Sequence, residues 1–449
     1  MLIATAVDRT AIIDWYRRTR ERSAALFDLI DPAAYYTRPI SLRNPIVFYE
    51  GHLPAFSVLA FLRRGLERAS VDARLEKLFE RGIDPESEAA AVPRSGASTA
   101  WPSRDEVLAF ARACDDAILE AIADFVPAPE AIEGLYTALE HEAMHQETLL
   151  YMFHRLPYEL KRRGSLSERR YPAADGRAPT GVAALPRSAV VPAGDAVLGA
   201  DRDAVPFGWD NEFDGHVVRV SGFEIDTLPV TNAQFLEFLE AGGYHHRELW
   251  DDEGWAWVQA QQVAHPAFWS PATGPSPRAT LQSSPSRWGW REMFSAVPLP
   301  ADTPVYVSHA EASAYARWKG RRLMTEAEWH RAADGATAGH ADFAGFDPIA
   351  VGSYPETASV HGVQDLIGNG WEWTSTVFAP FDGFTPMRAY PEYSADFFDG
   401  RHYVMKGASP VTARELIRPS FRNWFRGTYP YVYAKFRTAA AAGGTRVAR

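Results

Sequence analysis

Residues 129–156 read PEAIEGLYTALEHEAMHQETLLYMFHRL, and this stretch decides how the first part of the chain folds. Its apolar residues recur at the spacing of an amphipathic helix, so it predicts one long helix. Within that helix His141 and His145 are four positions apart and project from the same face, where their imidazoles can share a metal ion. Two such histidines can also lie on a bundle surface or form a satisfied pair in a core. The stretch therefore predicts a helix that carries a candidate metal site.

Three earlier segments have the same helical periodicity: residues 11–30, 47–66 and 103–126. Asp8 or Thr10 can cap the first of these helices. Ser103 and Glu106 have the spacing of a capping box at the start of the third. Pro54 lies inside the second, and we expect it to bend that helix or to delay its start.

The chain divides into two parts of different composition. Residues 1–163 contain the four helical segments and predict a helical bundle. Residues 164–190 are rich in Gly, Pro, Ser and Arg without periodicity, which predicts a linker. After it 12 of the 14 tryptophans occur, Gly and Pro recur at short intervals, and apolar runs such as 303–308 and 402–407 are brief. Residues 191–449 therefore predict a compact domain of turns, short strands and a few short helices, and the whole chain an α+β protein.

Composition excludes several classes of protein. The 449 residues are 46% apolar and 23% charged, which is typical of a globular chain with room for two or three domains. There is no run of about 18 apolar residues and no apolar signal segment near the N-terminus. Cys114 is the only cysteine, so an internal disulfide or a cysteine-based metal site is excluded, and we expect a cytoplasmic protein. The net charge of −11 argues against nucleic acid or an anionic membrane as the main partner.

Residues 141–145 also match H-E-x-x-H, the zinc-protease pattern, in which Glu142 would act as general base on zinc-bound water. Such an enzyme needs a third ligand downstream. The metzincin continuation is absent, and the next carboxylates, Glu159 and Glu168, lie at the predicted linker. A zinc protease remains an alternative without an obvious third ligand.

A third ligand can instead come from an earlier helix. His52 lies in an apolar segment, FYEGHLPAF, where a lone histidine is more often a core residue bonded to the backbone. If antiparallel packing brings His52 opposite His141 and His145, three neutral imidazoles would hold an ion and leave positions open for substrates and dioxygen. Imidazole suits iron, zinc and copper alike, so ligand type does not choose the metal. Glu147 projects from a different side of the helix, so we expect it in a supporting or surface role.

These motifs together resemble a known family. A bundle with a separated histidine followed by H-x-x-x-H-x-E resembles the DinB-like N-terminal domain of the ergothioneine sulfoxide synthases (EgtB). The second half is similar to their formylglycine-generating-enzyme-like domain, which has a C-type-lectin-type fold. The matching stretches are residues 207–220, 229–244, 321–333, 368–384 and 419–425. True formylglycine generators work through cysteines in this domain, and here the domain has none.

The resemblance implies a chemistry. It implies a mononuclear non-haem iron(II), Fe2+, held by His52, His141 and His145. It also implies that hercynine, which is trimethyl-histidine, binds beside the iron and that dioxygen drives attachment of sulfur to the imidazole C2. By position, Asn423 and Trp424 look like the family's contacts for the trimethylammonium and carboxylate end of hercynine. An indole face attracts a quaternary ammonium, although Trp424 can also be an ordinary core aromatic.

Four departures from the family concern the sulfur donor and the proton donor. Relatives that use gamma-glutamylcysteine have an arginine where this chain has Trp101, and an acidic residue where it has Phe425. Some synthases use a catalytic tyrosine whose nearest counterpart here is Phe378. Met144 replaces a glutamine that is often found between the two helix histidines. These departures leave the catalytic proton donor unidentified and predict a neutral, aromatic donor pocket.

Two branches of the family lack the charged residues that bind the gamma-glutamyl group. The ovothiol synthases take free cysteine, but their usual C-terminal methyltransferase has no counterpart here. The selenoneine synthases (SenA) couple a selenosugar to hercynine, and residues 44–56 and 422–437 look closest to that branch. A neutral pocket suits a sugar better than a zwitterion, so the leading hypothesis is selenoneine synthesis by C–Se bond formation. Alternatives are a hercynine sulfoxide synthase that uses cysteine or gamma-glutamylcysteine, a zinc peptidase, and a non-catalytic binding scaffold.

The predicted partners are therefore small molecules: hercynine, a selenosugar or thiol donor, and dioxygen. Neither nucleic acid nor a membrane is expected. The candidate arginines for the donor pocket are Arg104, Arg422 and Arg426, although a solvated surface position is the more common fate of an arginine.

Overall fold

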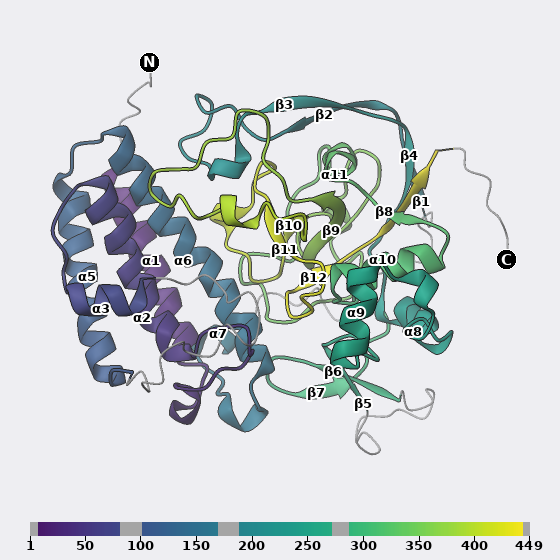
Figure 1. Cartoon of the computed structure of the whole chain (residues 1–449), viewed down its shortest axis with the longest axis horizontal. Coiled ribbons are helices and arrows are strands. Elements are labelled where there is room, and N and C mark those ends of the chain that lie inside the picture. Colours follow the sequence, from purple (N-terminus) through teal and green to yellow (C-terminus); the bar gives the residue numbers. More distant parts are fainter. Residues whose placement is uncertain (1–7, 81–100, 169–187, 272–286, 443–449) are drawn as a thin grey trace. The chain divides into compact units, whose positions relative to one another are not determined.

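The computed structural model describes residues 8–80, 101–168, 188–271 and 287–442, and its contacts form two compact units (Figure 1). One unit comprises Met1–Arg169 together with Thr385–Tyr393. The other comprises Arg170–Phe384 and Ser394–Arg449. Most of the predicted linker, residues 164–190, lies outside the described residues. A short piece of the second half of the chain thus belongs to the helical unit.

The helical unit contains the four predicted helices. They are α1 (Arg9–Phe27), α2 (Ile46–Ser57), α5 (Arg104–Asp124) and α6 (Pro129–Arg155). The described residues add α3 (Ala73–Phe79), the short α7 (Ser165–Glu168) and a π-helical segment, η2 (Val58–Gly65). Pro54 does not delay the start of the second helix, because α2 begins at Ile46, passes through Pro54 and continues directly into η2. Pro54 cannot donate a backbone hydrogen bond, and the widened turns of η2 begin four residues after it.

The helix starts largely follow the sequence. The Asp8 carboxylate accepts the N–H of Ala11 at 3.0 Å and caps α1. The Ser103 hydroxyl accepts the N–H of Glu106 at 3.2 Å and caps α5. The carboxylate of Glu106 pairs with Arg74, so only this half of the predicted capping box is observed.

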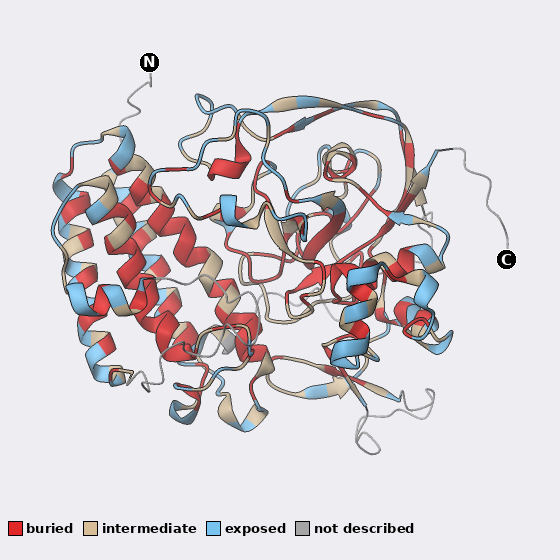
Figure 2. Ribbon diagram, viewed as in Figure 1, coloured by how far each residue is buried: buried red, intermediate tan, exposed pale blue. Residues whose placement is uncertain are grey.

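Two glycines allow the central helices to pack closely. A Cβ at Gly134 on α6 would lie 2.3 Å from the carbonyl oxygen of Ala60 in η2. A Cβ at Gly51 on α2 would lie 2.4 Å from the ring of Phe79. A larger residue at either position would push these elements apart. The close approach helps to bury every residue of α2 and most of α6 (Figure 2).

The second unit is a mixed domain with four sheets among its described residues. The sheet orders are β1-β4-β13-β8, β11-β10-β9-β12, β2-β3 and β5-β6-β7 (Figure 1). The strands are β1 (Ser188–Val191), β2 (Gly194–Leu198), β3 (His216–Val220), β4 (Phe223–Asp226), β5 (Trp269–Pro271), β6 (Trp288–Arg291), β7 (Ala296–Pro298), β8 (Arg322–Leu323), β9 (Gly370–Val377), β10 (His402–Ala408), β11 (Asn423–Arg426), β12 (Ala434–Lys435) and β13 (Thr438–Ala441). The helices are α8 (Asn232–Glu240), α9 (Asp252–Gln261), α10 (His309–Trp318) and α11 (Glu326–Ala332). The predicted α+β class is confirmed.

One expected strand is absent. Residues 303–308 form only an isolated bridge at Pro304. Their backbone hydrogen bonds reach two different segments. The N–H of Val305 donates to the carbonyl oxygen of Val230 at 3.0 Å, and the N–H of Val307 donates to that of Ala434 at 3.1 Å. A strand needs one continuous ladder, which this segment does not make.

The G-N-G-W-E-W motif, which runs into the start of β9, contributes to the core of this unit. Trp371 and Trp373 are buried, and the Trp373 indole N–H donates to the carbonyl oxygen of Val307 at 2.9 Å. Glu372 is fully buried and forms ion pairs with Arg437 at 3.0 Å and Lys435 at 3.2 Å. A buried carboxylate needs such partners. The motif therefore identifies the fold rather than the reaction.

Candidate metal centre

Three histidines from two helices converge inside the helical unit. His52 lies on α2, and His141 and His145 lie on α6. Their candidate ligand atoms all lie within 4.8 Å of one another. Among the described residues this is the group of His, Cys, Asp and Glu side chains that could hold a metal ion. The structure thus brings together the three residues proposed as ligands from the sequence.

His52 is oriented by a hydrogen bond. Its Nδ1 lies 2.7 Å from the carbonyl oxygen of Phe79, the last residue of α3. A carbonyl only accepts, so Nδ1 carries the proton and Nε2 keeps its lone pair. The ring of Phe48 stacks on the imidazole, with centroids 5.0 Å apart. This arrangement leaves the Nε2 lone pair free to bind a metal ion. Gly51 has no side chain, which allows the ring of Phe79 to pack closely against α2.

All three imidazoles are held in the neutral form that binds metals. Burial lowers the pKa of His52 to about 4, against a weaker opposite effect of the Phe79 carbonyl. Burial also lowers the pKa of His141 and His145 well below the ordinary value, and the neighbouring histidines lower both further. Arg43 adds to the effect on His145. Three neutral imidazoles, two of them buried and one half-buried, are a typical ligand set for a divalent transition metal.

The geometry fits one shared ion. The Nε2 atoms of His141 and His145 are 3.1 Å apart. Two nitrogens bound at about 2.1 Å to one ion, at a right angle, are about 3.0 Å apart. The Nε2 atom of His52 is buried and has no hydrogen-bond partner within the described part of the chain. A buried polar atom without a partner is costly, and a metal ion would satisfy it.

Glu142 does not belong to this group. It is 1% exposed and accepts hydrogen bonds from Arg20 Nη1 at 2.9 Å and from the Ser23 hydroxyl at 2.5 Å. Arg20 also donates to Asp115 at 2.8 Å, so the buried Glu142 is part of a partly buried ion network between α1, α5 and α6. Glu147 is also buried and lies outside the histidine group. The H-E-x-x-H pattern here uses its glutamate for packing.

Two tyrosines that were not predicted from the sequence lie beside the histidines. The ring centroid of Tyr390 is 5.9 Å from that of His141. The Tyr393 hydroxyl donates to the sulfur of Met144 at 3.3 Å. Both tyrosines belong to Thr385–Tyr393, the piece of the second half that joins the helical unit. The only signal for them in the sequence is a Pro- and Tyr-rich stretch, and nothing in it points to the bundle.

Trp101 lies in the helical unit and packs on aromatic neighbours of His52. Its ring stacks on Phe79, with centroids 6.2 Å apart, and meets Phe48 edge-on at 6.3 Å. Arg104 was a candidate for the donor pocket. Its guanidinium instead forms a forked ion pair with the buried carboxylate of Glu50, with a closest distance of 2.8 Å.

Asn423 and Trp424 lie on β11, one of the two edge strands of the second four-stranded sheet. Both are half-buried. One face of the Trp424 indole is covered by Phe378, whose ring lies parallel to it with centroids 4.2 Å apart. Phe425, the next residue of the strand, stacks on Tyr429 with centroids 5.2 Å apart. The roles proposed for these residues from the sequence stay predictions.

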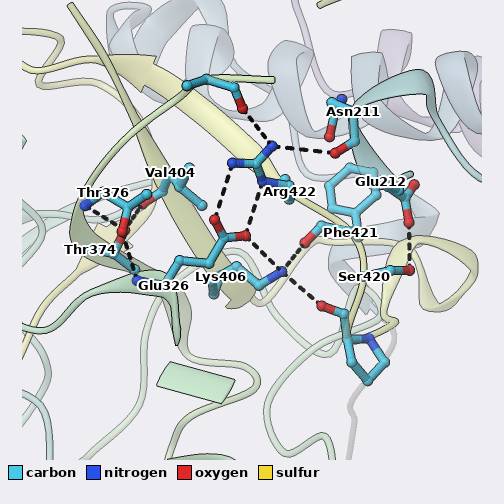
Figure 3. Close-up of polar contacts among 12 residues, drawn as sticks. Asn211, Glu212, Glu326, Thr374, Thr376, Val404, Lys406, Ser420, Phe421 and Arg422 are labelled. Atoms are coloured by element: carbon cyan, nitrogen blue, oxygen red, sulfur yellow. Dashed lines mark hydrogen bonds and ion pairs between the residues drawn. The ribbon is translucent and has the colours of Figure 1, made fainter. Parts of the chain in front are cut away.

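A buried ion network supports the start of β11 (Figure 3). Arg422 is 2% exposed and makes two hydrogen bonds to Glu326 at 3.0 and 3.1 Å. It also donates to the carbonyl oxygens of Asn211 and Ala379. Lys406 donates to the carbonyl oxygen of Phe421 at 2.6 Å, beside this pair. Arg422 is therefore a structural residue and not a free group of a donor pocket.

Comparison with known proteins gives a family for both units. Residues 174–442 match the sulfatase-modifying factor enzyme 1-like domain, and residues 16–149 match the DinB superfamily. No helix in the described residues has the length and hydropathy needed to cross a membrane.

Several matches to whole proteins extend over nearly all of the chain. It is 32% identical over 447 residues to the hercynine oxygenase of Mycolicibacterium thermoresistibile, which covers 94% of this chain and 92% of the relative. It is also 32% identical to the hercynine oxygenase of Mycolicibacterium smegmatis, over 96% of this chain and 99% of the relative. Ergothioneine biosynthesis protein 1 of Neurospora crassa is 25% identical over 89% of this chain and 54% of the relative. The chain therefore belongs to the EgtB-like hercynine oxygenase family, in which a DinB-type helical domain precedes a sulfatase-modifying-factor domain.

Proposed function

We propose that this chain is an iron(II)- and dioxygen-dependent enzyme that forms a bond between a chalcogen atom and C2 of the hercynine imidazole. The observation that carries the proposal is the convergence of three neutral imidazoles from α2 and α6, two of them buried and that of His145 half-buried. Relatives named hercynine oxygenase match nearly the whole chain and support this class of reaction.

His52, His141 and His145 would hold the metal. When bound, iron(II) supplies the redox chemistry that activates dioxygen, together with open coordination positions for the reactants. The protein contributes a buried site in which the ligands are already deprotonated. Burial also excludes water from the reacting groups and strengthens electrostatic contacts there.

A zinc protease is the weaker interpretation of the same helix. Its general base would have to be Glu142, which instead accepts hydrogen bonds from Arg20 and Ser23 in a partly buried network. Glu142 also lies outside the histidine group, whereas a general base must lie within hydrogen-bond reach of the metal-bound water.

The binding of hercynine is proposed to involve Asn423 and Trp424. The trimethylammonium group of hercynine carries a charge that cannot be removed, and an indole face attracts such a group. Phe378 covers one face of Trp424, so the ammonium would meet the indole from another side. The network of Arg422, Glu326 and Lys406 gives this strand a fixed starting point (Figure 3).

For the second substrate we propose a selenosugar. The family resemblance implies charged residues at the positions of Trp101 and Phe425 in relatives that use gamma-glutamylcysteine, and here both side chains make aromatic contacts. A glutamyl carboxylate without its arginine loses a charge-assisted hydrogen bond of roughly 1.5–3 kcal/mol. A neutral sugar has no such charge to satisfy, so these two positions favour it.

The overall reaction balances with dioxygen as the oxidant. The C2–H bond of hercynine and the Se–H bond of the selenol are replaced by a C2–Se bond. One oxygen atom of dioxygen goes to selenium, which gives a selenoxide, and the other leaves as water with the two hydrogens. The same balance holds for a thiol donor and a sulfoxide.

An aerobic assay tests this proposal. Purified protein with iron(II) and hercynine is offered a selenosugar, cysteine or gamma-glutamylcysteine, and the products are analysed by mass spectrometry. We expect the selenosugar adduct to form fastest and the His141→Ala variant to form none. A sulfoxide formed faster from gamma-glutamylcysteine would contradict the selenosugar proposal, and no product from any donor would contradict the reaction class.

A further inference from the structure

The segment Thr385–Tyr393 is fastened to the helical unit by its backbone. The N–H of Ala389 donates to the carboxylate of Glu133 on α6 at 2.7 Å. The carbonyl oxygen of Ala389 accepts a hydrogen bond from Arg64 in η2 at 2.8 Å. Arg388 adds weaker ion pairs to Glu67 and Glu130, each at 3.6 Å. Two directed bonds at one residue fix the segment in register on the bundle.

This fastening places the ring of Tyr390 in the aromatic layer around His141. Tyr390 packs on Phe56 of α2, with centroids 4.9 Å apart and planes at 63°. Phe56 in turn lies flat on the imidazole of His141, at 3.5 Å and 13°. Tyr390 meets the same imidazole edge-on, at 5.9 Å and 74°. The two rings thus restrict His141 from two directions.

His141 differs in this respect from His52. The Nδ1 of His52 is tied to the carbonyl oxygen of Phe79, as is usual for a metal ligand. The Nδ1 of His141 is buried and has no hydrogen-bond partner within residues 8–80, 101–168, 188–271 and 287–442. The rotation of this imidazole is therefore not fixed by a hydrogen bond from Nδ1. The rings of Phe56 and Tyr390, which pack against it, can restrict that rotation instead.

We propose that Tyr390 is a positioning residue of the metal centre, which holds the imidazole of His141 in its ligand orientation by ring packing. The second half of the chain thereby completes a site whose three candidate ligands all lie in the first half. The inference rests on the proposed function only for the assignment of the histidines as metal ligands. It concerns metal affinity and not the identity of either substrate.

The ring, and not the hydroxyl, should matter for this role. Tyr390→Phe keeps the ring, and Tyr390→Leu removes it while leaving an apolar side chain of moderate size. We expect Tyr390→Leu to weaken metal binding about 10-fold, because the loss of a group that orients a ligand typically costs 10–100-fold in affinity. We expect Tyr390→Phe to bind the metal like the wild type.

Anaerobic titration of the metal-free full-length protein with Co(II) tests these expectations, with the visible absorption spectrum of bound Co(II) as a second readout and competition by Fe(II) as a third. A changed Co(II) spectrum in Tyr390→Leu would support a changed ligand geometry, which a merely structural role would not produce. Wild-type affinity and spectrum in Tyr390→Leu would overturn the inference. So would an equal loss of affinity in Tyr390→Phe, because that result would assign the effect to the hydroxyl.

A second variant acts from a distance. Glu133→Ala removes the acceptor of the Ala389 N–H without touching His141, and Asp124→Ala is the matched control, since it removes an exposed ion pair with Arg68 on the same unit. We expect weaker Co(II) binding in Glu133→Ala and unchanged binding in Asp124→Ala. Equal affinity in both variants would count against the inference. A wild-type protein that binds neither Co(II) nor Fe(II) would instead overturn the proposed function, and with it the need for a positioning residue.

Discussion

Replacing Glu142 with glutamine distinguishes two interpretations of the helix that carries His141 and His145. In one the helix belongs to a three-histidine oxygenase site, and in the other to a zinc protease with Glu142 as the base. In the structure the Glu142 carboxylate is buried and accepts from Arg20 and Ser23. Glutamine has nearly the same size and keeps one carbonyl oxygen as an acceptor, but it removes the negative charge. The change therefore weakens the ion network and leaves the histidine group in place.

The expected cost follows from the contacts. Removing one partner of a buried ion pair typically costs about 3–5 kcal/mol. Here Arg20 keeps its bond to Asp115 at 2.8 Å, its side chain is 16% exposed, and the glutamine oxygen still accepts. We therefore expect the free energy of unfolding to fall by about 2 kcal/mol, which lies within the usual worth of a hydrogen bond to a charged group.

Urea denaturation of the metal-free protein, followed by far-ultraviolet circular dichroism, measures this loss. The control is Glu106→Gln, which weakens an exposed pair with Arg74 and should cost about 0.5 kcal/mol or less. We expect Glu142→Gln to bind iron like the wild type. Full stability combined with intact iron binding and abolished turnover would refute this reasoning, because it would identify Glu142 as a base at the metal.

Two further predictions concern the choice of donor substrate and the response to pH. Trp101→Arg combined with Phe425→Asp should raise kcat/KM for gamma-glutamylcysteine relative to the selenosugar by about 10-fold or more, from the worth of one charge-assisted bond; an unchanged ratio would count against the proposed choice of donor. Burial lowers the pKa of His309 from 6.5 to about 3. Between pH 6.5 and about 3 His309 therefore binds a proton in the unfolded chain but not in the folded chain. The free energy of unfolding falls as the pH falls below about 6.5. His309→Phe, which can keep the stack on Tyr403, should reduce the stability loss between pH 6.5 and 5.5 by about 1 kcal/mol; an unchanged loss in chemical denaturation would contradict this.

Local features of the helical unit could be predicted from the sequence. The periodicity of α6, its proline at the first turn, and the caps at Asp8 and Ser103 depend on contacts within a few residues. The spacing of His141 and His145 gave the same face for the same reason. The seven-residue α3 was missed because it is too short to show a clear period.

Contacts between distant segments could not be read in this way. The fastening of Ala389 by Glu133 joins residues 256 apart in the chain, and no local pattern in either segment indicates the other. Tyr390 therefore looked like one aromatic among many. Residues 303–308 have the composition of a strand, but their bonding partners lie on two different segments, which composition does not indicate. Arg422 was likewise interpreted as a candidate residue of the donor pocket. Its ion-pair partner Glu326 lies about a hundred positions away, so the sequence around Arg422 does not indicate the pair.

Iron content tests the three-histidine site most directly. Wild-type protein and His52→Ala are loaded anaerobically with iron(II), freed of unbound metal and analysed by inductively coupled plasma mass spectrometry, with circular dichroism to verify folding. The three-ligand site predicts one equivalent of iron in the wild type and a large loss in a folded His52→Ala variant. A full equivalent of iron retained by His52→Ala would show that this histidine is not a ligand and would contradict the proposed metal centre.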